Sequence, residues 1–290
     1  MNLSFSHKTF NTQFKIYKGK TMSVRPLTDE QLKEQAPVLF TEQPHFETSD
    51  KYHFVSSIDV INEIKSHNWH PVSVQQSSVK DEDKDGYQRH VVRFRHFEDL
   101  LNPKENAVEL LLFNSHDRST AFSISAGIYR FVCSNGLVIA DSVFESYKIK
   151  HIGDRANDIH TAIDKITSFK PQLEYKINKF EALKLSTGER EAFAKSSIAL
   201  RFPEHLEVDY KDLLVPHRDE DNKDDLYTTL NIIQENLLSG NVSGVNKETG
   251  RRFTSREITS IGKDKEINQG LWDIAERISS IKEPEMALAA

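Results

Sequence analysis

The chain has 290 residues, 37% of them hydrophobic and 28% charged, a composition typical of a folded globular protein and not of a disordered one. Its formal net charge of −6 excludes a protein that coats nucleic acid with its whole surface, so any nucleic-acid site must be a local basic surface. The single cysteine, Cys133, excludes an intrachain disulfide, and no apolar run reaches the roughly 20 residues of a membrane span, so we expect a cytoplasmic protein without a membrane partner.

The N-terminal region is polar and predicts a peripheral arm over residues 1–45, with one short helix near 28–35. An amphipathic helix follows. It is expected to have Ser57 as its N-cap, to carry an isoleucine at every third position, and to end before Pro71.

Alternating hydrophobic residues then predict a sheet, because side chains at every second position of a strand lie on one face. The expected strands lie near 72–79, 87–97, 107–113 and 120–125. The helical spacing of Ile128, Phe131 and Val132 predicts a short helix that stops at Asn135 and Gly136, and a last strand is expected at 137–140.

Beyond residue 153 the hydrophobic spacing becomes helical. We expect a long helix that Pro171 kinks or splits, a helix capped by Ser186 and Glu189, a helix stopped by Gly240, and a final helix over 267–281. The prediction is an α+β fold in which a mixed, mainly antiparallel sheet with helices occupies residues 46–153. A mainly helical region over 154–290 is expected to lie on it, as one unit or as two tightly joined ones.

Short motifs occur in a fixed order between Lys51 and Ile281. They lie at 112–117, 127–138, 151–153, 212–218, 231–240, 250–252 and 268–272. Together they make the chain similar to the family called domain of unknown function 932, whose members are described as phage or plasmid-like proteins. The resemblance implies a home on mobile genetic elements, where recombination, replication and evasion of host defence are common roles.

An arginine stripe is predicted on the second strand of the sheet, where Arg89, Arg93 and Arg95 share the face opposite to the hydrophobic residues. Arginine makes bidentate contacts with phosphate, and an antiparallel sheet can leave one face open for them. Tyr87 and Phe97 are expected on the same face, where bases could stack on their rings. The alternative is a solvated outer face on which the arginines pair with carboxylates.

A second group of basic residues comprises Arg251, Arg252 and Arg256, which we expect just before a helix start, where backbone N–H groups would help to hold a phosphate. The alternative is a basic loop that pairs with the acidic stretch 219–225. Either surface could be extended by Lys148, Lys150 and His151.

His116 and Asp117, in a turn between two strands, are candidates for acid–base chemistry or metal ligation. The alternative is an ordinary turn, since turn formers surround them and no further carboxylates lie at ligand spacing. Cys133 has apolar neighbours and predicts a buried core thiol rather than a nucleophile. Residues 234–236 are expected to hold their helix against a neighbour through buried hydrogen bonds.

Three functions follow from these residues. The first is a non-enzymatic protein that binds or anneals single-stranded DNA on a mobile element and assembles into homo-oligomers, with the six arginines on phosphates and Tyr87 or Phe97 on bases. The second is a metal-dependent nucleic-acid enzyme centred on His116 and Asp117. The third is an anti-defence or regulatory protein that binds a host protein. The sequence predicts no cofactor and no resident metal.

Overall fold

A computed structural model describes residues 15–17, 20–22, 25–48, 52, 54–104, 106–130, 135–138, 147–148 and 155–289 of the chain. Cys133, Lys150 and His151 lie outside the described residues, as does the side chain of Lys148. No helix in the described part of the chain is long and apolar enough to cross a membrane.

The main sheet is antiparallel throughout and has the strand order β3-β4-β5-β6-β7, with β8 also paired to β6. Its strands are β3 (Trp69–Gln76), β4 (His90–His96), β5 (Asn106–Asn114), β6 (Ser123–Arg130), β7 (Asn135–Val138) and β8 (Tyr147–Lys148). Strand β5 is central and its hydrophobic residues are buried on both faces, which explains its nearly continuous apolar sequence.

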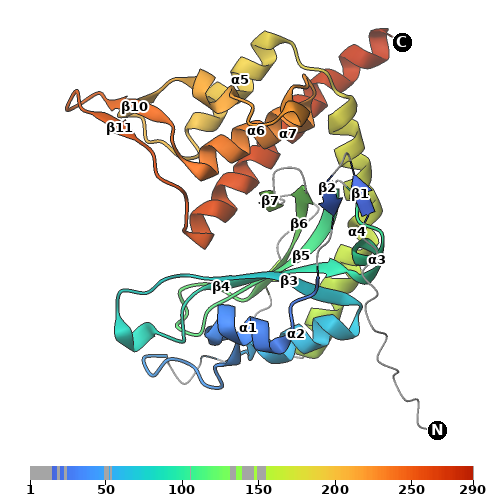
Figure 1. Cartoon of the computed structure of the whole chain (residues 1–290), viewed down its shortest axis with the longest axis vertical. Helices are drawn as coiled ribbons and strands as arrows, with labels where there is room; N and C mark the ends of the chain where they lie inside the picture. Colours follow the sequence, from blue (N-terminus) through green and yellow to red (C-terminus); the bar gives the residue numbers. More distant parts are fainter. Residues whose placement is uncertain are drawn as a thin grey trace.

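Helices cover one face of this sheet, as Figure 1 shows in its lower half. They are α1 (Asp29–Gln35), the short 3₁₀ helix η1 (Pro37–Phe40), α2 (Ser57–Ser66) and the first half of α4 (Arg155–Ala182). Leu32 and Leu39, from the predicted arm, have no exposed surface and belong to the main core. That part of the arm is therefore part of the folded body.

The C-terminal half consists of helices and a small sheet. Its helices are α5 (Thr187–Ile198), α6 (Leu226–Ser239) and α7 (Ile261–Ala289), with the 3₁₀ helices η3 (Tyr210–Leu214) and η4 (Asp219–Asp221). Strands β9 (Leu206–Val208), β10 (Ser243–Asn246) and β11 (Arg252–Thr254) form the small antiparallel sheet. The remaining described elements are β1 (Lys15–Tyr17), β2 (Lys20–Met22), η2 (Glu82–Lys84) and α3 (Phe97–Leu101).

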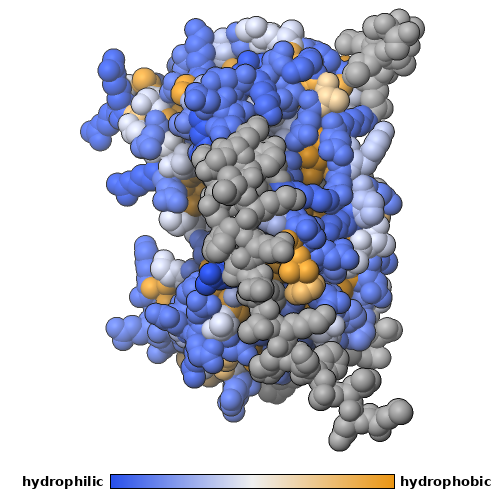
Figure 2. Space-filling view, turned by 45° about the vertical axis from the view of Figure 1, so that its right-hand side comes forward, coloured by the Kyte–Doolittle hydropathy of each residue, from blue (hydrophilic) through white to orange (hydrophobic). Residues whose placement is uncertain are grey.

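One hydrophobic core joins the two halves, because α4 runs from the main sheet into the helical half. Its Ile163 and Ile166 belong to the same buried cluster as Phe180, which contacts the ring of Trp272 in α7. On the face shown in Figure 2, the described surface is mainly hydrophilic and hydrophobic residues form only separate patches. The α+β class predicted from the sequence is confirmed.

Several predicted elements are also confirmed. Ser186 and Glu189 form the capping box of α5, and Gly240, with a φ of 85°, ends α6. Helix α2 begins one residue away from the prediction, with Ser56 as its N-cap. Pro171 lies inside α4 and does not split it.

Helix α2 ends at Ser66, before Pro71 as expected. Pro71 itself lies within β3, at a register irregularity. This is possible because β3 is an edge strand, where a missing N–H costs no ladder hydrogen bond. One predicted element was wrong where the structure describes it: Ile128 lies in β6, which runs through Arg130, and Asn135 begins β7, while Phe131 and Val132 lie outside the described residues. A short apolar run fits both helix and strand, and here burial within the sheet decides.

Candidate nucleic-acid interface

Strand β4 directs Arg93 and Arg95 away from Val92 and Phe94, as its alternation predicts. Both arginines bind one carboxylate on the neighbouring strand. Arg93 Nε donates to Glu109 Oε2 at 2.5 Å, and Arg95 Nη2 donates to Oε1 at 2.9 Å. Arg95 is 2% exposed and Glu109 has no exposed surface. This cluster is buried, so Arg95 cannot contact a phosphate in this conformation.

The start of α7 covers this face of the sheet, which is why the arginine stripe is not open. Ile261 forms a second hydrophobic cluster with Val91, Leu111 and Phe113. Lys265 Nζ lies 4.4 Å from the centre of the Phe113 ring. The sequence could not show this covering, because the segment that provides it lies about 150 residues further along the chain.

Arg93 also borders a small cavity of 50 Å³ between the sheet and α7. Its Nη2 atom has no hydrogen-bond partner among the described residues, and Asp264 lines the same cavity. Burial raises the pKa of the Asp264 carboxyl, and the positive charge of Arg93 only partly opposes this. The cavity is too small for a nucleotide, so Arg93 and Arg95 are structural residues and we remove them from the proposed contacts.

Tyr87 and Phe97 do not form a joint stacking platform, since they lie at opposite ends of β4. The Tyr87 ring makes an edge contact with His45, with centroids 5.1 Å apart. Phe97 begins α3, and its ring centroid lies 6.0 Å from that of His70. Strand β4, which lies between them, spans roughly 20 Å at about 3.4 Å per residue.

Arg251 and Arg252 lie in a β-hairpin that the sequence did not reveal, and the helix expected after this segment, α7, begins at Ile261. Strand β11 pairs with β10, and its Phe253 points inward to within 6.2 Å of the Phe202 ring. Alternation therefore directs Arg252 outward. Gly250, with a φ of 66°, closes the turn before Arg251. Both arginines are exposed.

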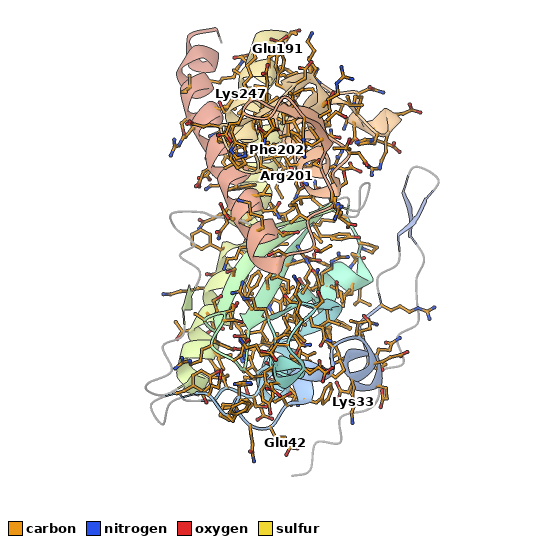
Figure 3. All side chains as sticks on the ribbon, turned by 90° about the vertical axis from the view of Figure 1, so that its left-hand side faces the viewer. Lys33, Glu42, Glu191, Arg201, Phe202 and Lys247 are labelled. Atoms are coloured by element: carbon orange, nitrogen blue, oxygen red, sulfur yellow. The ribbon has the colours of Figure 1, made fainter. Side chains whose placement is uncertain are left out.

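Arg256 is exposed as well, on a segment held tightly against the end of α6. The Arg201 guanidinium donates to the backbone carbonyls of Leu237 and Arg256. Gly240 permits this close approach, since a Cβ there would lie 2.6 Å from the Arg256 carbonyl carbon. Figure 3 shows Arg201 with Phe202 and Lys247 in the C-terminal half, far from Lys33 and Glu42. The backbone that carries Arg256 is thus fixed in position.

None of Arg251, Arg252 and Arg256 forms an ion pair within the described part of the chain. The acidic stretch 219–225, their predicted alternative partner, is engaged elsewhere. Its Asp221 binds Arg130 and Arg218, and its Asp224 binds Lys184. Three exposed guanidinium groups therefore remain available to a ligand.

The segment that carries Arg256 runs from β11 down to the first turn of α7 (Figure 1). Arg89 lies beside the lower end of this segment. A Cβ on Gly262 would lie 3.5 Å from Arg89 Nη1. We call Arg251, Arg252, Arg256 and Arg89 the basic strip. Residues 247–265 contain six basic and three acidic side chains in a chain whose net charge is negative. Lys247 and Lys263 were missed in the sequence, although the charge pattern of this segment shows them.

His116 is buried, whereas Asp117 is half-buried in the turn that follows β5. His116 has no exposed surface, and neither ring nitrogen has a hydrogen-bond partner among the described residues. Burial lowers the pKa of His116 to about 4, so its ring is neutral at physiological pH. Asp117 is occupied in the turn, where its Oδ1 accepts the Ser119 N–H at 2.9 Å.

A buried serine–histidine pair, which the sequence analysis missed, lies beside His116. Asn114 Nδ2 donates to Ser57 Oγ at 3.0 Å. The Gln88 carbonyl can only accept, so His90 carries its proton on Nδ1, and its Nε2 accepts from the Ser57 hydroxyl at 2.8 Å. His90 Nδ1 then donates to the Gln88 carbonyl at 3.0 Å. Burial, with the nearby His116 ring, lowers the pKa of His90 to about 3. All of these side chains are buried, so the chain of bonds fixes α2 to the sheet rather than serving a substrate.

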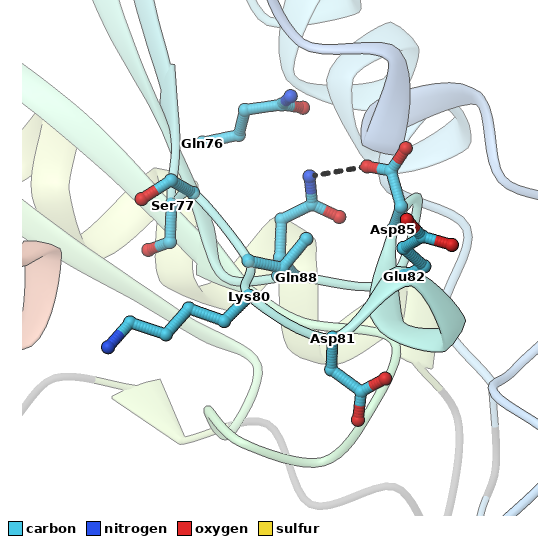
Figure 4. Close-up of a pocket in the computed structure, with 9 residues that line it drawn as sticks. Gln76, Ser77, Lys80, Asp81, Glu82, Asp85 and Gln88 are labelled. Atoms are coloured by element: carbon cyan, nitrogen blue, oxygen red, sulfur yellow. Dashed lines mark hydrogen bonds between the residues drawn. The ribbon is translucent and has the colours of Figure 1, made fainter.

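The loop between β3 and β4 forms an open hollow of about 740 Å³, shown in Figure 4. Asp81, Glu82 and Asp85 line it, together with the single cation Lys80. Gln88 donates to Asp85 at 3.4 Å across it. The excess of carboxylates disfavours a phosphate-bearing ligand, so this hollow is not part of the proposed interface.

Comparison with known proteins places the chain in a family. The model of the family described as domain of unknown function (DUF932) matches residues 44–271. The chain belongs to the DUF932 family. It is 32% identical over 255 residues to the UPF0380 proteins YafZ and YfjQ of Escherichia coli strain K12, covering 88% of this chain and 92% of each relative. No solved structure matches it.

Several motif residues of the C-terminal half meet around α6, as predicted for residues 234–236. Gln234 Nε2 donates to Asn268 Oδ1 at 2.6 Å, and Arg218 binds Glu235 through two parallel bonds of 2.7 and 2.6 Å. Asn236 Nδ2 donates to the carbonyls of Leu213, Val215 and Ile232, and its Oδ1 lies 2.7 Å from His217 Nε2. The predicted buried hydrogen bonds are confirmed for Gln234 and Asn236, whereas the pair of Glu235 with Arg218 is half-buried. In this chain these residues therefore help to hold the helical half together.

Proposed function

We propose that this DUF932 protein binds single-stranded nucleic acid through the basic strip, without catalysing a reaction on it. The observation that carries the proposal is the set of three exposed arginines without ion pairs on one firmly held segment. In a chain of net charge −6, such a segment is a local site of the kind that phosphate recognition needs.

The geometry of the basic strip suits a flexible single strand of nucleic acid. Arg251 and Arg256 are five residues apart in extended chain, so at most about 17 Å separate their Cα atoms. Arg89 continues the positive charge beside the first turn of α7, and a helix N-terminus itself favours an anion. Guanidinium groups bind phosphate bidentately and also stack on unpaired bases, which a duplex does not offer.

The other two predicted functions have less support. An enzyme centred on His116 and Asp117 would need the His116 ring to reach a substrate, and that ring is buried. A host-protein partner would need a docking surface, and on the face in Figure 2 the hydrophobic patches are separate. We also propose that the protein is encoded on a mobile genetic element and acts in recombination there.

Fluorescence anisotropy with a labelled single strand of about 20 nucleotides tests the proposal. We expect binding at about 50 mM salt that weakens as the salt concentration rises, because bound arginines release counterions from phosphates. Each phosphate contact contributes roughly −0.7 to the slope of log K against log salt, so the change Arg251→Gln, Arg252→Gln and Arg256→Gln should reduce the slope by about 2.

A matched control removes the same charge elsewhere. Lys33, Lys223 and Arg277 are exposed and lie outside the strip, so changing all three to glutamine should leave the slope unchanged. A duplex of the same sequence should bind more weakly. Absence of binding at low salt, or an equal loss in both triple variants, would show that the basic strip is not the site.

A further inference from the structure

Three metal-ligating side chains converge between α2 and α4, on the helix-covered side of the main sheet. Glu63 lies in the last turns of α2, His67 is the residue that caps its C-terminus, and His160 lies in the second turn of α4. Glu63 Oε1 lies 2.5 Å from His160 Nε2 and 3.6 Å from His67 Nε2. One ligand atom from each of the three lies within 4.8 Å of the others.

The core fixes the two helices that carry these residues. Ile61 and Ile64 of α2 have no exposed surface, and Ile159 and Ile163 of α4 are buried in the same cluster. The two imidazole rings meet edge to face, with centroids 4.7 Å apart and planes inclined by 77°. Ligands carried on packed helices are held close to one geometry, which lowers the entropic cost of binding an ion.

The donor set selects a class of ion. Two imidazole nitrogens and one carboxylate oxygen suit Zn²⁺ and neighbouring transition metals, whereas Ca²⁺ and Mg²⁺ prefer oxygen ligands alone. Tetrahedral bonds of about 2.0–2.1 Å place two ligand atoms roughly 3.3 Å apart. The contact between Glu63 and His67 is near that value, and the contact between Glu63 and His160 has to open by less than about 1 Å.

The side chains are 27–45% exposed, so an ion can enter from solvent and water can complete its coordination. We propose that Glu63, His67 and His160 form a transition-metal site, of the zinc class, that joins α2 to α4. When the ion binds, three bonds to metal replace the contacts between the Glu63 carboxylate and the two imidazole rings. The ion thereby links two helices whose ligands, Glu63 and His160, are 97 positions apart in sequence. This site does not depend on the proposed nucleic-acid function.

Metal titration of the full chain, free of histidine tags and pretreated with chelator, tests the site. We expect one equivalent of Zn²⁺ to bind in competition with a chromophoric chelator, and Co²⁺ to give the visible absorption of a site with nitrogen and oxygen ligands. Excess Zn²⁺ should raise the melting temperature, because an ion that binds only the folded state stabilises it. Mg²⁺ should do neither.

Single substitutions assign the ligands. Glu63→Gln, His67→Ala and His160→Ala should each weaken Zn²⁺ binding by at least tenfold, while His205→Ala, at a half-exposed histidine in the other half, should not. Glu63→Gln keeps the side-chain volume, so it still tests the metal site if a histidine variant fails to fold. Failure of the wild-type chain to compete with the chelator for Zn²⁺, or unchanged binding in Glu63→Gln, would overturn the site and leave an ordinary ion pair.

Discussion

Replacing Glu109 by alanine is expected to lower the free energy of unfolding by about 3–5 kcal/mol, the usual cost of leaving one side of a buried ion pair unpaired. Arg95 would keep its burial and its position 4.2 Å from the centre of the Tyr129 ring but lose its carboxylate. Urea unfolding, followed through the buried Trp69 and Trp272, measures the effect in both halves of the molecule.

Two comparisons make this prediction specific. Glu207→Ala, at an exposed position in β9, should change stability by less than about 0.5 kcal/mol. Replacing Arg93, Arg95 and Glu109 together by hydrophobic residues of similar volume should recover most of the loss, because no buried charge then remains unpaired. A Glu109→Ala protein as stable as the wild type would show that the arginines are free on the surface.

Acid is expected to destabilise the fold through its buried histidines. His116 has a folded-state pKa of about 4, against about 6.5 when unfolded, so the unfolded chain binds more protons between these values. The stabilisation is therefore complete above about pH 6.5 and is lost as the pH falls toward 4, which amounts to roughly 3 kcal/mol from His116 alone. His90, with a folded-state pKa of about 3, acts in the same direction.

His116→Phe isolates this effect from the carboxylates that also titrate in acid. The Phe54 ring, 4.8 Å away between centroids, can accept another aromatic neighbour, and the change removes two buried nitrogens that lack partners. We expect the variant to match the wild type at pH 7 and to lose about 3 kcal/mol less than it between pH 7 and pH 4. An equal loss of unfolding free energy in the two proteins between pH 7 and pH 4 would contradict the prediction.

Local signals in the sequence were sufficient for most helices and for the sheet. The capping box at Ser186 and the stop at Gly240 are encoded within a few residues, and so is the alternation in β4 and β5. The strands of the small sheet were missed because they have only three or four residues, too few for a periodic pattern.

The accessibility of the arginines could not be predicted in the same way. Alternation places Arg93 and Arg95 on one face, but only tertiary structure shows that both pair with Glu109 and that α7 covers them. Conversely, Arg251 and Arg252 are exposed in a hairpin that the sequence did not reveal. The cluster of Glu63 with His160 likewise depends on two helices meeting across 97 positions.

Photo-cross-linking tests the central claim most directly, since it reports where a strand lies and not only that it binds. A single strand carrying photoreactive thymine analogues is irradiated with the protein, and the modified peptides are identified by mass spectrometry. The account predicts cross-links within residues 247–265 and near Arg89. Cross-links confined to other regions, such as the acidic hollow between β3 and β4, would contradict it.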